Sequence, residues 1–316
     1  MNIVVTGGAG FIGSEIVRQL VKSGNSVLVL DNLTYSANIN SIKLIFSKLE
    51  FCKIDIANEI ELNLALSSRN IDVLIHCAAE THVDNSIQGP EIFLQTNIIG
   101  TFNLIKIAAK RRFKFIQVST DEVYGSIEVG AFTELDRLNP SSPYSASKAS
   151  GEMMVMSYGK TFGLEFIIVR CANNYGPFQH TEKLIPLFIK KLLSNQRVPL
   201  YGNGLNYREW IHVSDCANAI IRVAFEGKSN SIYNISSQDS KSNLEVANML
   251  ISLLNCDASS IEFVADRLGH DLRYAIDSKK IQLELGWFPK IDFEAGLRST
   301  IDWYQTYGSE ATEVHE

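Results

Sequence analysis

Mostly apolar runs alternate with amphipathic segments along the first 172 residues. The runs have the length and content of strands buried on both faces of a parallel sheet. They cover residues 2–7, 26–31, 49–56, 72–79, 114–120 and 165–173. Between the first two runs the apolar positions fall on one helical stripe, and further helices are expected near 89–111 and 144–160. The alternation predicts a doubly wound α/β fold on a parallel sheet.

The pattern changes after residue 172. Amphipathic helices are expected within 182–195, 242–255 and 296–308, and a short strand and a helix share residues 202–227. No repeat, low-complexity tract or Pro/Gly/Ser-rich linker separates the two parts. We therefore predict a sheet domain over 1–172 and a smaller C-terminal α/β lobe over 173–316. Part of that lobe is expected to return to the first domain, with a cleft between them.

Composition narrows the class of protein. Of 316 residues, 46% are hydrophobic and 20% are charged, and the net charge of −6 comes with no basic tract. This balance argues against nucleic acid as a partner. The first strand begins at Asn2, which leaves no room for a secretory signal, and no apolar run is expected to span a membrane. A cytoplasmic protein is expected.

The five cysteines are scattered and form no Cys-x-x-Cys pair, which predicts free thiols and no metal site.

A glycine-rich loop joins the first strand to the first helix. "TGGAGFIG" spaces Gly7, Gly10 and Gly13 three apart, and glycine lets the backbone approach a pyrophosphate at a helix N-terminus. Asp31 ends the second strand, where a carboxylate accepts both ribose hydroxyls and repels a 2′-phosphate, and no Arg follows in "DNLTYSAN". A glycine-rich turn without a ligand is the alternative. The context predicts a Rossmann-like domain that binds NAD.

A second set of candidates follows the strand at 114–120. Tyr144 and Lys148 stand four apart at a helix start, so both side chains face one way. A neighbouring ammonium and a cationic nicotinamide are expected to lower the pKa of the Tyr144 phenol from about 10. In "STDEVYG", Asp121 and Glu122 follow Thr120. Adjacent residues on a regular strand face opposite ways, so either both acids turn into one cavity beyond the strand end or they are solvated charges.

These motifs resemble the extended short-chain dehydrogenase/reductase superfamily, and within it the nucleotide-sugar 4,6-dehydratases, most closely those acting on dTDP-glucose. The similarity runs along most of the chain. It is carried by "TGGAGFIG", "AAETHVDNSI", "TNIIGT", "STDEVYG", "PSSPYSASKA", "NNYGPFQ", "EKLIPL", "YREWIHV" and "DRLGHDLRYAID". Related sugar epimerases and decarboxylases share the Tyr/Lys pair but generally lack the Asp-Glu pair.

The resemblance implies a role for each catalytic candidate. Tyr144, supported by Lys148, would take the proton of the carbon 4 hydroxyl as hydride passes to NAD, and Thr120 would position that oxygen. Glu122 would then remove the proton from carbon 5, and Asp121 would protonate the departing carbon 6 hydroxyl. Hydride return to carbon 6 would regenerate NAD, which makes the enzyme a lyase. Such chemistry needs a protonated Asp beside an ionised Glu.

The same resemblance implies two binding sets. The cofactor set is Gly7, Gly10, Phe11, Ile12, Gly13, Asp31, Asn32, Leu33, Thr34, Asp55, Ile56, Cys77, Ala78, Ala79, Glu80, Thr81, Thr96, Tyr144, Lys148 and Asn174. The nucleotide-sugar set is Thr81, Thr120, Asn173, Lys183, Leu184, Pro199, Leu200, Tyr201, Arg208, Asn243, Arg267 and His270. Arg208 could instead be a surface ion-pair partner. His82 is interpreted as a structural residue beside the cofactor loop.

Two departures from the dehydratase pattern lie in loops of the C-terminal lobe: Leu268 replaces a usual Pro, and His180-Thr181 replaces a common Phe-Pro. They leave UDP-glucose open as an alternative substrate. A UDP-sugar 4-epimerase or decarboxylase, or a non-catalytic NAD-binding protein, is a weaker alternative. The resemblance also implies a homodimer that pairs the helices near 96–111 and 144–160.

Overall fold

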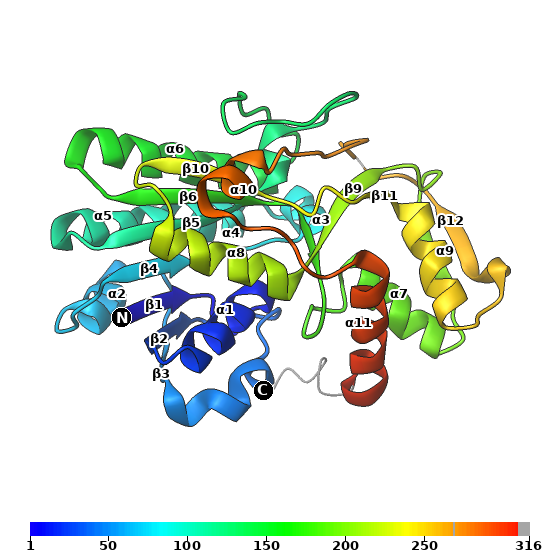
Figure 1. The fold of residues 1–316 in the computed structure, drawn as a ribbon, viewed down its shortest axis with the longest axis horizontal. Coiled ribbons are helices and arrows are strands. Elements are labelled where there is room, and N and C mark those ends of the chain that lie inside the picture. Colours follow the sequence, from blue (N-terminus) through cyan, green and yellow to red (C-terminus); the bar gives the residue numbers. More distant parts are fainter. Residues whose placement is uncertain (268, 309–316) are drawn as a thin grey trace.

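The computed structural model describes residues 1–267 and 269–308. Its main feature is a seven-stranded parallel sheet in the order β10-β6-β5-β4-β1-β2-β3 (Figure 1). The strands are β1 (Asn2–Thr6), β2 (Ser26–Asp31), β3 (Glu50–Lys53), β4 (Val73–His76), β5 (Lys114–Thr120), β6 (Phe166–Cys171) and β10 (Ser231–Ile235). The predicted Rossmann-like fold is confirmed.

Both faces of this sheet are covered by helices. In β1, Ile3 and Val5 belong to one core and Val4 to the other, because alternate strand residues face opposite ways. The first core includes α1 (Phe11–Lys22) and α8 (Val213–Glu226), and the second includes α2 (Glu59–Leu66), α5 (Thr101–Arg111) and α6 (Pro143–Phe162). Each fully buried aliphatic side chain contributes about 1.5–3 kcal/mol to folding.

A smaller lobe lies at one end of the molecule, where α7, α9 and α11 gather (Figure 1). Its core packs these helices against short strands, with Phe188, Trp210 and Leu250 buried among them. One sheet has the order β11-β9-β7, and a two-stranded sheet joins β12 to β8. The elements are β7 (Asn173–Tyr175), α7 (Leu184–Leu193), β8 (Val198–Tyr201), β9 (Tyr207–His212), β11 (Ser240–Ser242), α9 (Asn243–Leu253), β12 (Ile261–Val264) and α11 (Phe293–Tyr307).

The chain crosses between the two parts more than once. After β7 and β9 have entered the small lobe, α8 packs against α1, and β10 pairs in parallel with β6. The helix α10 (Lys279–Leu285) then packs on β10. Segments from beyond residue 172 therefore complete the main sheet as well as building the small lobe.

Most predicted helices and strands are confirmed within two or three residues. The run at 49–56 is shorter than expected, since β3 ends at Lys53 and residues 54–56 leave the sheet. Sequence patterning missed the 3-10 segment η1 (Ile39–Lys48), α2 and α3 (Val83–Gln88). In α2 the apolar residues do not form one stripe: Ile60 and Leu64 are exposed while Leu62 and Leu66 are buried.

One helix is longer and more apolar than the sequence patterning indicated. The continuous helical run Glu91–Arg111 comprises α4 (Glu91–Phe93), the π-helical turn η2 (Leu94–Gly100) and α5. By length and composition alone it could cross a membrane, but half of its apolar window is buried in the fold. A core helix of a globular protein can pass the same test of length and composition.

Candidate active site

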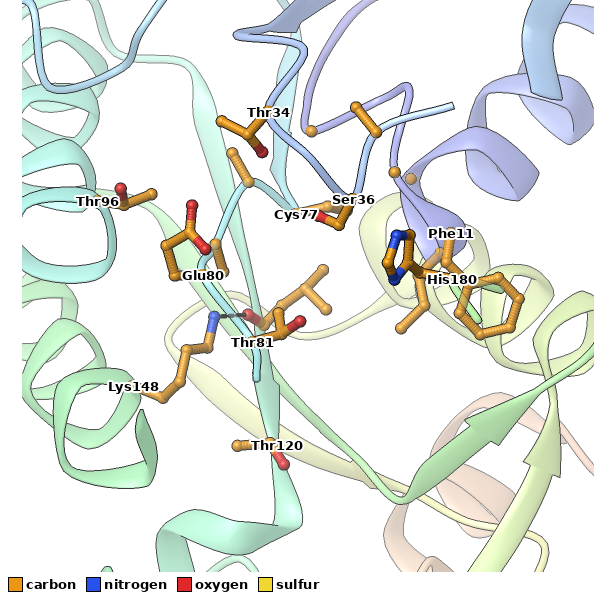
Figure 2. A pocket seen from close by; sticks show the side chains of 18 of the residues that line it. Phe11, Thr34, Ser36, Cys77, Glu80, Thr81, Thr96, Thr120, Lys148 and His180 are labelled. Atoms are coloured by element: carbon orange, nitrogen blue, oxygen red, sulfur yellow. Dashed lines mark hydrogen bonds between the residues drawn. The ribbon is translucent and has the colours of Figure 1, made fainter. Parts of the chain in front are cut away.

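The carboxyl ends of the parallel strands open into a cleft of ≈ 300 Å³. Such crevices are where ligands bind in open α/β sheets. Figure 2 shows Glu80 and Lys148 on one side of it and Phe11 and His180 on the other. The lining brings together the glycine loop, the end of β2, residues 77–81, the start of α6 and the segment 171–174.

The glycine loop needs its glycines for two different reasons. Gly7 has φ +68°, a conformation that side chains rarely adopt. A Cβ on Gly13 would lie 2.0 Å from the Gly7 carbonyl oxygen, so any larger residue would push the loop off the helix. The helix α1 begins at Phe11 with Gly10 as its N-cap, and no side chain caps it. Its free amides are positioned to receive a pyrophosphate.

Asp31 lines the cleft at the end of β2 and is 7% exposed. Its two carboxylate oxygens accept from the Ala9 amide at 2.9 Å and the Leu33 amide at 2.8 Å. Burial raises the pKa of this carboxyl, and the two amides oppose that rise. Each oxygen retains a lone pair for a ribose hydroxyl. Leu33 itself does not line the cleft; it has φ 55° and contributes its amide to Asp31.

Asn97 hydrogen-bonds to Glu80 in the cleft lining. The sequence did not predict this residue as part of the site. Its amide oxygen accepts from the Glu80 amide at 2.9 Å, and its nitrogen donates to the Glu80 carbonyl at 3.0 Å and to Ser147 at 2.9 Å. The side chain is 2% exposed. It therefore ties residues 77–81 to α6. Its place next to Thr96 in "TNIIGT" was the available signal.

The two acids turn into the cleft because β5 ends at Thr120. The hydroxyl of Thr120 accepts from the Glu122 amide at 3.3 Å and caps the 3-10 helix η3 (Asp121–Tyr124). Thr120, Asp121 and Glu122 all line the cleft. The alternative of solvated strand-end charges is wrong, since Asp121 is 2% exposed.

The carboxyls of Asp121 and Glu122 have different electrostatic surroundings. Burial raises the pKa of Asp121 to about 8, and the neighbouring Glu122 charge adds to the rise. Burial also raises the pKa of Glu122, but there Arg208, Lys183 and Arg267 oppose the rise. Among the described residues, the Oδ2 atom of Asp121 is buried without a hydrogen-bond partner. Near neutral pH, Asp121 carries a proton and Glu122 faces three cations.

Tyr144 and Lys148 project from the first turns of α6 into the cleft. The capping box of Ser142 and Ser145 fixes this helix start. Lys148 donates to the Val118 carbonyl at 2.8 Å, and burial lowers its pKa to about 8. The expected lowering of the Tyr144 pKa is wrong for the protein without a ligand: burial raises it, and the Glu122 charge raises it further.

The expected cofactor residues other than Leu33 line this cleft. The expected substrate residues divide: Thr81, Thr120, Asn173 and Lys183 line it. The others lie outside its lining, and Leu200 packs in the small lobe's core. They are Leu184, Pro199, Leu200, Tyr201, Arg208, Asn243, Arg267 and His270.

The cations of the small lobe are already held by neighbours. Arg208 is 7% exposed, donates to the Asp271 carbonyl at 3.0 Å and lies 4.1 Å over the Tyr274 ring. It is not the surface ion-pair partner that was the alternative. Arg267 forms an ion pair with Asp84 at 2.6 Å. Leu268 lies outside the described residues.

Sequence reasoning missed several polar residues of the lining. Gln179, His180 and Glu182 come from the loop between β7 and α7, and Ser36 comes from the loop after β2. The Tyr35 hydroxyl donates to Glu182 at 3.3 Å, which joins those two loops. His82 caps α3 through its ring nitrogen and lies 3.9 Å from Glu182, as expected of a structural residue.

The arrangement defines a class of protein. A parallel sheet with a glycine loop, an acid at the end of β2 and a Tyr144–Lys148 pair at the cleft belongs to a nicotinamide-dependent enzyme of the extended short-chain dehydrogenase/reductase class. A family model described as GDP-mannose 4,6 dehydratase matches residues 4–300. The chain belongs to this family of nucleotide-sugar 4,6-dehydratases.

Named relatives make the similarity specific. A probable dTDP-glucose 4,6-dehydratase of Sinorhizobium fredii is 43% identical, over 98% of this chain and 94% of its own. The dTDP-glucose 4,6-dehydratase of Mycobacterium tuberculosis is 44% identical, over 96% and 93%. The structure of DesIV, a dTDP-glucose 4,6-dehydratase from Streptomyces venezuelae with NAD and TYD bound, matches with a TM-score of 0.95 at 44% identity, over 98% of both chains.

Proposed function

We propose that the protein uses NAD to dehydrate dTDP-glucose to its 4-keto-6-deoxy product. The observation that carries this proposal is the pair of acids that follows Thr120 at the cleft. The pKa of buried Asp121 is raised to about 8, whereas Arg208, Lys183 and Arg267 oppose the rise in the pKa of Glu122. An epimerase or decarboxylase has no need for an acid and a base on neighbouring carbons. Family membership and the dTDP-glucose dehydratases among its relatives support the same activity.

The cleft fits NAD. The amides of the glycine loop suit the pyrophosphate, Asp31 suits the adenosine ribose, and Asp55 suits the adenine edge. In the described chain, the Oδ1 atoms of Asn173 and Asn174 are buried at the cleft without hydrogen-bond partners, as expected where a ligand supplies them. The bound nicotinamide would accept hydride from carbon 4 and return it to carbon 6.

The chain's own residues would move the protons. The phenolate of Tyr144 removes the proton from the carbon 4 hydroxyl and becomes the phenol, with Thr120 hydrogen-bonded to the same oxygen and Lys148 favouring the phenolate beforehand. A bound cation must offset the burial that raises the pKa of Tyr144. This requirement makes oxidation depend on an occupied cofactor site.

Elimination would then fall to the two acids. Glu122 removes the proton from carbon 5, which the 4-keto group has acidified. Asp121, protonated near neutral pH, donates to the carbon 6 hydroxyl as its bond to carbon breaks, and water leaves. Carbon 5 regains a proton when carbon 6 receives the hydride, so no net oxidation occurs.

The direct test is incubation of the purified protein with dTDP-glucose and, separately, with UDP-glucose. A 4-keto product lighter by one water is expected from dTDP-glucose. Product only from UDP-glucose would assign the other nucleotide. Unchanged mass with inversion at carbon 4 would assign an epimerase and refute the proposal.

We also propose that the protein is a cytoplasmic homodimer. The helical run Glu91–Arg111 packs against α6 through α5 and η2. Large apolar side chains are exposed on these elements; they are Ile92, Leu94, Ile99, Met153 and Phe162. A second copy would cover them through a two-fold interface, in which each copy presents the same patch. Light scattering should give twice the mass of one chain. Met153→Lys should lower the measured mass toward that of a single chain.

The lobes divide the work in this proposal. Residues 1–172 carry most of the NAD site, and the small lobe within 173–316 supplies the contacts to the nucleotide sugar. Lys183, Arg208 and Arg267 act on the charge of Glu122 from that side and are suited to a diphosphate.

A further inference from the structure

A buried, hydrogen-bonded cluster lies behind the turn that carries the two acids. At its centre are Arg170 on β6, which is 2% exposed, and Glu152 on α6, which is 0% exposed. Arg170 Nη2 donates to Glu152 Oε2 at 2.6 Å, and Nε lies 3.0 and 3.2 Å from the two carboxylate oxygens. A buried ion pair seldom stabilises a fold more than apolar residues of the same size. Stability alone therefore does not account for this pair.

One side of the cluster holds the strand and helix of the site. The Ser119 hydroxyl donates to Glu152 Oε1, and Ser119 pairs with Arg170 across β5 and β6. The next residue along β5 is Thr120. On α6, Glu152 follows Lys148 by one turn, and its charge opposes the burial that lowers the pKa of Lys148.

The other side holds the acid–base turn. Arg170 Nη1 donates to the Tyr124 hydroxyl at 2.6 Å, and the guanidinium lies 4.6 Å over the Tyr124 ring. That hydroxyl donates in turn to Asn234 Oδ1 at 2.9 Å, on β10. The ring stacks on Phe132 at 4.9 Å with an interplanar angle of 10°. Burial raises the pKa of Tyr124 to about 12, so the phenol keeps the proton that it donates.

We propose that Tyr124 and Arg170 are positioning residues that hold Asp121 and Glu122 against carbons 5 and 6 of the sugar. Tyr124 is the last residue of η3, and the Thr120 cap fixes only the first end of that turn. Glu152 orients the Arg170 fork for this contact. The inference rests on the dehydratase function proposed above.

Loosening this turn should affect one step and spare another. Oxidation at carbon 4 depends on Tyr144, which is carried by α6 and its own capping box. Elimination depends on Asp121 and Glu122, which the turn carries. A shift of the turn should therefore slow elimination while oxidation continues, so that reduced nicotinamide accumulates during turnover.

The test compares Tyr124→Phe with Tyr233→Phe. Tyr233 is also buried, and its hydroxyl donates to Glu284 at 2.7 Å and accepts from the Lys228 amide at 3.0 Å, away from the cleft. Both changes remove one buried hydroxyl with two partners, so both should lower the melting temperature. Only Tyr124→Phe should slow product formation, by about 10–100-fold, as misplacement of reacting groups does.

The readouts are near-ultraviolet absorbance of reduced nicotinamide and proton exchange at carbon 5 in heavy water. Tyr124→Phe is expected to raise the absorbance of reduced nicotinamide and to slow proton exchange at carbon 5. Arg170→Lys keeps a cation beside Glu152 but loses the forked hydrogen bonds of the guanidinium. It should likewise slow elimination and leave oxidation at carbon 4 intact. It serves as the second variant if Tyr124→Phe does not fold.

Three outcomes would overturn the inference. Equal loss of oxidation and elimination in both the Tyr124 and Arg170 variants would make the cluster merely structural. If both variants oxidise carbon 4 and eliminate water at the same relative rates as an active wild type, the positioning role is refuted and the dehydratase function remains. A wild type that releases no water from either nucleotide sugar would refute the function and the inference together.

Discussion

The two ends of the cleft are built from different parts of the polypeptide. At the cofactor end, the contacts offered to a ligand come largely from backbone: the amides of the glycine loop and residues 77–81, fixed by the ends of β1 and β4. At the end proposed for the substrate, Lys183 lines the cleft, and Arg208 and Arg267 lie outside its lining but act on the charge of Glu122 through long side chains. Each is oriented by a partner of its own, such as the Thr81 carbonyl, which accepts from Lys183 at 2.9 Å.

The two ends of the cleft therefore differ in the substitutions that they can tolerate. Backbone contacts are set by the sheet and cannot be altered without disturbing the fold, whereas a side chain can be exchanged with a local effect. Nucleotide preference can therefore change within the small lobe while the cofactor end stays the same. The acids on η3 stand between the two ends, and changes there should have the largest consequences.

The largest effect is expected from Glu122→Gln. Loss of the base should lower turnover by about 10²–10⁴-fold, the usual contribution of such groups. Tyr144 and Lys148 are untouched, so reduced nicotinamide should form on mixing with substrate and persist, and exchange at carbon 5 should stop. Stopped-flow absorbance and mass spectrometry in heavy water measure both. Tyr144→Phe is the control and should form no reduced nicotinamide. Wild-type turnover in Glu122→Gln would refute the role of the acids.

Asp121→Asn should lower product formation by a comparable factor and should also change how kcat depends on pH. The acid form of Asp121 is needed, and its pKa of about 8 predicts that kcat falls as pH rises through 8. Asp121→Asn should retain oxidation and carbon 5 exchange, lose about 10²–10⁴-fold in product formation, and lose that alkaline limb.

Stability should also depend on the protonation of Asp121. The folded pKa lies above the unfolded value, so this group favours the folded state at acidic pH, and the contribution is lost as pH rises from about 4 to 8. Asp121→Asn should therefore have a melting temperature that falls less than that of wild type between pH 5 and 8. Equal pH dependence in both proteins would contradict the assigned pKa.

Asp31→Ala tests the cofactor end. Loss of charge-assisted hydrogen bonds to the ribose should weaken NAD binding by about 1.5–3 kcal/mol and narrow the preference over NADP. The Ala9 and Leu33 amides also lose their acceptor, so the melting temperature should fall. Asp55→Ala is the comparison: Asp55 accepts from the Ala57 amide at 2.8 Å and is proposed to lie at the adenine edge, so its loss should weaken NAD and NADP binding alike and leave the preference between them unchanged. Calorimetry with NAD and NADP gives both affinities.

Arg208→Ala tests the substrate end and should have the smallest effect on turnover. The change removes binding common to ground and transition states, so KM should rise by roughly 10-fold or more while kcat changes little. Arg273→Ala is the control: its guanidinium donates to the Gly130 carbonyl at 2.9 Å, whereas Arg208 is among the cations that act on Glu122. A collapse of kcat with KM unchanged would place Arg208 in the chemistry.

The sequence predicted the parts of the site that strands determine. Gly7, Asp31 and Thr120 each follow or end an apolar run, and parallel strands bring such ends to one edge. It did not predict Asn97, Gln179 or Glu182, because their places depend on which loops meet across the cleft. The predicted lowering of the Tyr144 pKa depends on a bound cationic ligand; without one, burial and the Glu122 charge raise this pKa.

The return of β10 to the main sheet has a consequence for synthesis. Residues 1–172 leave the ribosome with β6 as an open sheet edge, and the hydroxyl of Tyr124 has no Asn234 to bind until residues 231–235 emerge. Domains generally fold as units, and in chain order, during translation. Here the larger unit cannot close until most of the small lobe's early segments have been made. A chain halted near residue 172 would be an aggregation-prone fragment rather than a finished domain.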